Sequence, residues 1–213
     1  MNSSLFIKDS SDFILKTKNL HLDDNDIMVN FDGVSLFTKI SVPEALDLIS
    51  KLVDPETFNH IKICLTLTFF TYKGKFYEQS EGAVMGSSLS LVVANILMEY
   101  FEALALNNFH QKPKCWFKFV DDTFVIWPHG QTTLSSFHEH LNSLSPHIKF
   151  TRETEIDNAS PFLDVLVIRR LGGSLSHQVF RKKTHTNRYL HANSHHHPAQ
   201  NMLFLKPLLL VLF

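Results

Sequence analysis

The chain has 213 residues, of which 44% are hydrophobic and 19% are charged, and its formal net charge at pH 7 is -1. It is long and apolar enough to bury one core, as expected of an intracellular α/β domain. Its two cysteines, Cys64 and Cys115, indicate neither a disulfide framework nor a zinc site. Residues 1–11 lack the apolar region of a signal peptide, and the apolar segment 202–213 is too short to span a bilayer. A membrane is therefore not expected as a partner.

The first informative element is a short apolar strand, expected over residues 26–31, which leads into Asp32. An acid at the end of a strand is often only the cap of the following turn, so Asp32 is ambiguous by itself. Two helices are expected next, over residues 43–53, with Pro43 in the first turn, and over residues 55–71.

A small hairpin is expected over residues 70–72 and 75–78, around Lys73-Gly74. Gly82 and Gly86 then remove side chains where the backbone must approach another group closely. Ser87 is a candidate N-cap for a helix expected over residues 88–107. The free N–H groups at such a helix start are an anion site, although a Gly-Ser turn before a helix is usually just a cap.

The second acidic element is Asp121-Asp122, which interrupts an apolar, aromatic and β-branched run over residues 115–127. Strand formers on both sides predict a hairpin with the two acids at its turn. An acidic pair beside an apolar sheet is costly unless a cation neutralises it, and hard oxygen ligands suit Mg²⁺. Nucleotidyl-transfer enzymes hold two such ions about 3.5–4 Å apart. A site for two ions needs a further carboxylate from a neighbouring strand, and Asp32 is the best candidate for it. The alternative is that Asp121-Asp122 is only a polar turn of an ordinary β-hairpin.

The remaining elements complete an α+β pattern, an antiparallel sheet backed by helices. A helix is expected over residues 132–144, a strand over 148–153, and a strand pair, 162–170 with 175–181, across Gly172-Gly173. From residue 158 onward the chain has seven Lys or Arg and one acid; before it there are 13 Lys or Arg and 20 acids, a balance of -7. The basic C-terminal third is the expected nucleic-acid surface, although a charge run is more often a solvated face.

Three segments together resemble motifs A, B and C of reverse transcriptases, with wording closest to Penelope-like retroelements. They cover residues 31–38, 82–90 and 119–122, and further matches occur at residues 74–79, 161–166 and 184–190. The resemblance extends over almost the whole chain up to about residue 200. It implies an RNA-directed DNA polymerase palm whose partners are an RNA template, a DNA primer and a deoxynucleoside triphosphate, with a nuclear location.

The resemblance also implies residue roles. Asp32, Asp121 and Asp122 would be the catalytic acids and the ligands of two Mg²⁺ ions, with Mn²⁺ as an alternative. Phe37 would be an aromatic gate against the ribose 2′-hydroxyl, or else an ordinary core residue. The incoming nucleotide and the template would face Gly82, Gly86 and Ser87. Phe162 and Leu163 would begin the family's primer-contacting motif. The charge of the C-terminal third, rather than a family motif, adds Arg181, Lys182 and Lys183 as expected primer or template contacts. Lys149 stands where a proton donor to pyrophosphate is expected, or is a strand-edge lysine.

The resemblance divides the chain into a remnant of fingers or leader (1–25), the palm (26–170), a basic palm-to-thumb connection (171–200) and a divergent apolar tail (201–213). The fingers are expected to be largely missing and the thumb truncated. Gly33, Ser88 and Leu91 depart from the family, which usually has Val at the first position and Pro at the other two. A zinc site at His191 and His195–His197 is a minor alternative.

Two other hypotheses remain open at this point. The chain could be a catalytically inactive fragment that at most binds nucleic acid through its basic end. It could also be a metal-dependent phosphotransfer or receiver-like domain using Asp32 and Asp121, which predicts parallel strands alternating with helices.

Overall fold

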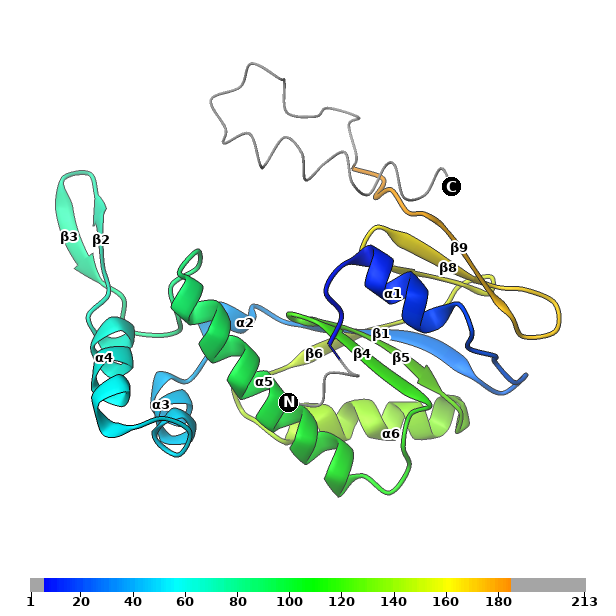
Figure 1. Cartoon of the computed structure of the whole chain (residues 1–213), viewed down its shortest axis with the longest axis horizontal. Coiled ribbons are helices and arrows are strands. Elements are labelled where there is room, and N and C mark those ends of the chain that lie inside the picture. Colours follow the sequence, from blue (N-terminus) through cyan, green and yellow to red (C-terminus); the bar gives the residue numbers. More distant parts are fainter. Residues whose placement is uncertain (1–5, 185–213) are drawn as a thin grey trace, which may run out of the picture.

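A computed structural model describes residues 6–184, which fold as helices and antiparallel strands (Figure 1). The predicted α+β class is confirmed. The helices are α1 (Ser10–Thr17), α2 (Leu36–Lys39), α3 (Val42–Ser50), α4 (Pro55–Thr66), α5 (Ser88–Asn108) and α6 (Gly130–Ser143). The strands are β1 (Ile27–Gly33), β2 (Phe69–Tyr72), β3 (Lys75–Glu78), β4 (Cys115–Phe119), β5 (Asp122–Trp127), β6 (Phe150–Thr154), β7 (Ala159–Phe162), β8 (Val165–Arg169) and β9 (Leu175–Val179).

The central element is a four-stranded sheet with the order β4-β5-β1-β6, in which every neighbouring pair is antiparallel. A receiver-like domain requires parallel strands joined by helical crossovers. The observed pairing therefore excludes that hypothesis.

One face of the sheet is covered by α5 and α6. Side chains alternate along a strand, so Val29, Phe31 and Trp127 share this face and are fully buried. They pack against α5 residues such as Leu97 and against Phe137 of α6 in the larger of two apolar cores. The Trp127 indole donates to Thr133 Oγ1 at 2.9 Å, which satisfies its polar atom inside this core.

The opposite face is covered by α1 and by a second sheet of three strands, β7-β8-β9. Met28, Phe124 and Ile126 point to this side. The ring of Phe13 from α1 lies 5.1 Å from that of Phe124 and 4.7 Å from that of Phe162 on β7, measured between centroids. Residues near the N-terminus therefore belong to the second core. The central sheet is the middle layer of a three-layer arrangement (Figure 1).

Helix α5 is long and apolar enough to cross a membrane by length and composition. Eight of its residues are buried, and six of them, among them Val93, Leu97 and Phe101, belong to the larger core. Its apolar character is thus accounted for by the sheet that it covers.

Several boundaries differ from those predicted. The helix expected over residues 55–71 ends at Thr66, because the aromatic residues from Phe69 onward form β2. The strand expected over residues 162–170 is two strands, with a turn at Leu163-Asp164. Helices α1 and α2 were not predicted. The segment 185–213, which includes the histidine run and the apolar tail, lies outside the described residues.

Candidate active site at the ends of the central strands

Asp32 and Asp122 lie directly opposite each other on neighbouring strands, at the end of β1 and the start of β5. Opposed residues of an antiparallel pair have Cα atoms about 4.5–5.5 Å apart and point to the same face. On its other side Asp32 is paired with Thr151 of β6, and Asp122 with Phe119 of β4. The acid at the end of β1 and the second acid of the doublet, 90 positions apart in the sequence, are therefore neighbours.

Asp121 is held beside this pair by the tight turn of the β4–β5 hairpin. Phe119 pairs with Asp122, so the loop has only two residues, Val120 and Asp121. The Gly33 N–H donates to the Asp121 carbonyl at 3.1 Å, which ties the turn to the end of β1. Val120 has a φ of 56°, in the left-handed region where a β-branched residue is strained. Strain of this kind persists only when the surrounding structure enforces it, and it is common at functional sites.

The charges at this site are poorly compensated. Burial, and then the charges of Asp121 and Asp32, raise the pKa of Asp122 to about 6. Burial, followed by Asp121 and Glu153, likewise raises the pKa of Asp32. Glu153 lies on β6 opposite Asn30, diagonal to Asp32 on the same face. Four carboxylates thus share one end of the sheet, and their ionised forms repel.

Lys182 lies close enough to the acids for its positive charge to oppose the rise in the pKa values of Asp32 and Asp122. Lys182 follows β9, whose continuation is fixed by a 2.8 Å hydrogen bond from the Phe180 N–H to the Asp164 carbonyl. Sequence reasoning assigned Lys182 to nucleic acid from a charge run alone. Glu153 was missed, because only the β1–β6 register brings it to the acids.

The carboxylates suit a divalent cation in kind, since they are hard oxygen donors whose repulsion a cation would relieve. Within residues 6–184, however, no three His, Cys, Asp or Glu side chains are grouped closely enough to hold a metal ion. Asp32 is exposed and Asp121 and Asp122 are partly exposed, so their side chains can rotate toward an ion. The strand register thus brings the backbone of these acids together, but their side chains are not grouped as metal ligands.

The predicted nucleotide-binding residues Phe37 and Gly82 are in direct backbone contact. The Ala83 N–H donates to the Phe37 carbonyl at 2.7 Å. Gly82 has a φ of 75°, and a Cβ added there would lie 2.7 Å from that carbonyl oxygen. Glycine is therefore required at position 82 by both conformation and space. The side chain of Phe37 is partly buried against the larger core.

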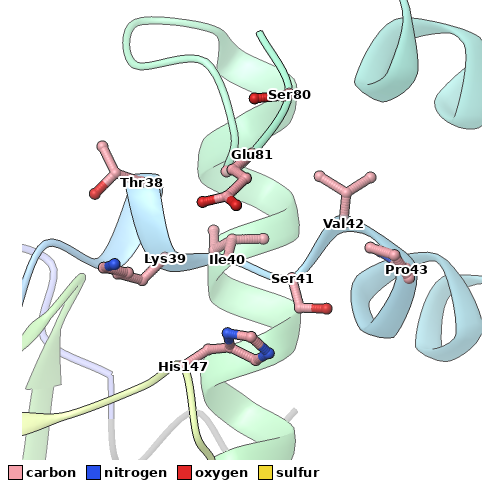
Figure 2. A pocket seen from close by; sticks show the side chains of 10 residues that line it. Thr38, Lys39, Ile40, Ser41, Val42, Pro43, Ser80, Glu81 and His147 are labelled. Atoms are coloured by element: carbon pink, nitrogen blue, oxygen red, sulfur yellow. The ribbon is translucent and has the colours of Figure 1, made fainter.

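A cavity of about 220 Å³ lies beside this contact (Figure 2). Figure 2 shows Glu81 above it and His147 below it, with the loop between α2 and α3 along its side. Its lining combines polar residues, such as Lys39, Ser41 and Ser80, with apolar ones, such as Ile40 and Val42.

Gly86 and Ser87 lead into α5. Gly86 has a φ of 88° and open space around it, so its conformation alone favours glycine. Ser87 is the N-cap of α5 but makes no side-chain capping hydrogen bond. The first N–H groups of α5 lack partners within the helix, as at every helix start. The anion site remains a prediction.

The predicted primer and template residues fall into two groups. Phe162 is 4% exposed and packs between Phe13 and Phe124, so its side chain belongs to the second core and is not available to a primer. Leu163 lies at the tip of the β7–β8 turn with a φ of 53°. The basic residues Arg181, Lys182 and Lys183 are exposed.

Lys149 is engaged away from the acids. Its ammonium donates to the carbonyls of Asn142 at 2.5 Å and Ser145 at 2.9 Å, at the C-terminal end of α6. A lysine at a helix C-terminus satisfies unpaired carbonyls. The structure gives Lys149 this role, in keeping with the reading of Lys149 as a structural lysine.

No protein-family model matches the chain, and no curated protein matches it in sequence. Solved telomerase structures do match. A telomerase of Candida tropicalis, in its apo form and truncated from its C-terminal domain, has a TM-score of 0.62 and 13% identity over 82% of this chain. Telomerase from Candida albicans, in complex with the TWJ fragment of telomeric RNA, has a TM-score of 0.62 and 12% identity over 84%. The fold is similar to that of a telomerase polymerase domain.

At this identity the likeness concerns the fold alone. The chain spans 41% and 36% of the length of these two telomerase chains. The order of strands in the central sheet explains why Asp32 and the Asp121-Asp122 doublet meet, because it sets β1 beside β5.

Proposed function

We propose that the chain is the palm of an RNA-directed DNA polymerase from a Penelope-like retroelement. The reaction is attack of a primer 3′-hydroxyl on the α-phosphate of a deoxynucleoside triphosphate, with pyrophosphate as the leaving group. The observation that carries the proposal is the pairing of Asp32 with Asp122 on neighbouring strands, next to Asp121 in a strained two-residue turn. The motif wording of residues 82–90 and 119–122 supports the retroelement family, and that family supports a nuclear location.

In this proposal Asp32, Asp121 and Asp122 hold two Mg²⁺ ions, or Mn²⁺ in their place. Such ions, when bound, stabilise charge on the attacking and leaving oxygens. The raised pKa values of Asp32 and Asp122 support the assignment, because repulsion among the acids favours cation binding. The protein itself contributes positioning, because the β1–β5 register and the Gly33–Asp121 hydrogen bond fix the backbone positions of the residues that carry the carboxylates.

The nucleotide is proposed to lie against Phe37 and the loop from Gly82 to Ser87. The backbone contact between Phe37 and Ala83 supports this, because it holds the proposed sugar gate and the proposed nucleotide loop together. The RNA template and DNA primer are proposed to follow the basic segment 181–183, which comes after β9 and includes Lys182, the lysine whose charge acts on Asp32 and Asp122. An alanine at Phe37 should accordingly admit ribonucleotides as well as deoxyribonucleotides.

A second candidate is a nucleic-acid-binding chain without catalysis. Two observations favour it: the described residues contain no assembled three-ligand metal cluster, and the charge of Lys182 partly compensates Asp32 and Asp122.

Primer extension on an RNA template with Mg²⁺ separates the candidates. The unaltered chain should extend the primer, and Asp121→Ala should abolish extension. Asp47→Ala is the matched control, because Asp47 is an exposed acid on α3 that pairs only with Lys51 at 2.7 Å. Extension that survives in Asp121→Ala contradicts the metal assignment. A chain that binds primer–template but never extends it supports the second candidate.

A further inference from the structure

The β2–β3 hairpin is unusually exposed for its composition. All eight residues of its two strands are exposed, and five of them are aromatic. The aromatic side chains are between 42% and 81% exposed, with Phe76 the highest. Figure 1 shows the hairpin projecting from the end of α4, away from both sheets. Exposed aromatic clusters of this kind mark interaction sites.

The strand register sorts these side chains into two different faces. Phe70 is opposite Tyr77, and Tyr72 is opposite Lys75, so these four residues share one face. The other face carries Phe69, Thr71, Phe76 and Glu78. We call the first the aromatic–basic face. It combines three rings with a lysine and has no acid, because the only carboxylate of the two strands, Glu78, points the other way.

The aromatic–basic face is ordered by its own contacts. The rings of Phe70 and Tyr77 are stacked, with centroids 5.4 Å apart and an angle of 17° between their planes. The ammonium of Lys73 lies over the Tyr72 ring at 5.4 Å from its centroid. The Lys73-Gly74 turn has positive φ at both residues, as in a type I′ hairpin turn, which makes the loop short and rigid. Two lysines therefore flank the rings at the tip.

We propose that the aromatic–basic face is a stacking platform for single-stranded nucleic acid, which in the polymerase proposed above would be the unpaired template. Rings that stack on bases, together with cations that meet phosphates, are how proteins bind single strands without sequence preference. The sign of the charge decides the occupant, because two lysines without an acid suit a phosphate backbone. The identification of the strand as template rests on the proposed function, whereas single-strand binding does not.

The position of the hairpin in the chain agrees with this role. Only residues 79–81 separate β3 from Gly82, the start of the proposed nucleotide loop. The Gln79 N–H donates to the Thr68 carbonyl at 3.0 Å and closes the base of the hairpin, and the Gln79 amide donates to the Glu81 carbonyl at 2.9 Å. The platform is thus linked to the loop by a short, hydrogen-bonded segment.

The test is fluorescence anisotropy of a short labelled oligouridylate with the full chain in EDTA, so that metal binding has no part in it. Tyr72→Ala should raise the Kd about fivefold or more, the effect of losing one base stack. Tyr72→Phe, which keeps the ring, should restore binding. Lys75→Ala should reduce the magnitude of the slope of log Kd against log salt by about 0.7.

Phe76→Ala is the matched control, because Phe76 is an even more exposed aromatic residue on the opposite face of the same hairpin. The proposal is overturned if Phe76→Ala weakens binding as much as Tyr72→Ala, if neither changes it, or if the unaltered chain does not bind the oligonucleotide. The proposal is also overturned if an unlabelled duplex competes for binding as well as an unlabelled single strand does. A third contrary result would be that altering the hairpin abolishes self-association of the chain, measured by sedimentation, without changing oligonucleotide binding.

These outcomes are independent of the primer-extension result. A chain that binds through Tyr72 but does not extend primers disproves catalysis and keeps the platform. If the unaltered chain extends primers and Tyr72→Ala binds the oligonucleotide with unchanged affinity, catalysis is supported and the platform is disproved.

Discussion

The β4–β5 hairpin carries two charged sites on opposite faces of the central sheet, and the two sites differ in how their charges are arranged. Lys118 of β4 points toward α5 and lies 3.2 Å from Glu102, with 4% and 6% of the two side chains exposed. Asp122, across the turn, points to the other face, where Asp32 and Asp121 are also acidic. On the face covered by α5, which we call the closed face, the unlike charges of Lys118 and Glu102 are paired. At the acidic end, where Asp32, Asp121 and Asp122 lie, like charges are brought together.

Each site carries a cost that reveals its role. Burial raises the pKa of Glu102, and the nearby Lys118 opposes that rise. The pair is at ion-pair distance, although its atoms are not aligned for a hydrogen bond. At the acidic end, repulsion and the left-handed Val120 are both unfavourable. The paired buried charges are accounted for by the fold, whereas clustered like charges with backbone strain are the pattern that is common at functional sites.

The largest expected effect on stability comes from breaking the buried ion pair between Lys118 and Glu102 on the closed face. Glu102→Leu leaves the Lys118 ammonium buried without its partner and should lower the free energy of unfolding by about 3–5 kcal/mol. The double variant Glu102→Leu, Lys118→Met should recover most of this loss, because no buried charge then remains. Urea denaturation measures both. If the double variant is as unstable as the single one, the ion pair is not the cause.

The acidic end should respond in the opposite direction. Asp122→Asn removes one of the repelling charges, so in EDTA it should raise the free energy of unfolding by about 1 kcal/mol, after allowance for solvent screening of a partly exposed group. Asp47→Asn, on the surface of α3, is the control and should give no gain. Thermal unfolding with added Mg²⁺ should then stabilise the unaltered chain more than Asp122→Asn. A loss of stability in Asp122→Asn without metal would show that the acids do not repel.

A strain test gives a smaller effect. Val120→Gly removes the strain of a β-branched residue in the left-handed region, which should raise the free energy of unfolding by about 1–2 kcal/mol. Glycine also makes the unfolded chain more flexible, so the net increase should be about 1 kcal/mol or less. The control is Val29→Gly in the middle of β1, where the backbone is extended and the side chain is fully buried, and which should destabilise instead. Chemical denaturation distinguishes the two signs. A destabilised Val120→Gly would mean that packing of Val120 outweighs its strain.

The pH dependence of stability is the finest test. The pKa of Asp122 is raised from its ordinary 3.8 to about 6, so between these values the folded chain binds more protons than the unfolded chain. By linkage, the contribution of Asp122 to the stability of the metal-free protein should therefore fall as pH rises from about 4 to about 6. Asp122→Asn lacks this contribution, so over the same range its stability should rise relative to that of the unaltered chain, measured by urea denaturation in EDTA. Identical profiles for the two proteins would contradict the assignment of the raised pKa.

The sequence itself determined the elements whose local signals agree. A run of apolar, aromatic and β-branched residues predicted β5, and the Lys73-Gly74 turn predicted the β2–β3 hairpin. The spacing of apolar residues predicted α5 to within one residue of its observed end. Asp32, Asp121 and Asp122 were singled out because an acid in an apolar strand run is costly wherever it lies. Local chemistry sufficed for these features.

Only the tertiary structure decided what those residues meet. The β1–β6 register brings Glu153 to the acids, the path after β9 brings Lys182 there, and the second core removes Phe162 from any primer. The reason is physical: a periodicity of two tells which residues share a face of one strand, but strand order and register, set by long-range packing, tell which residues share a site.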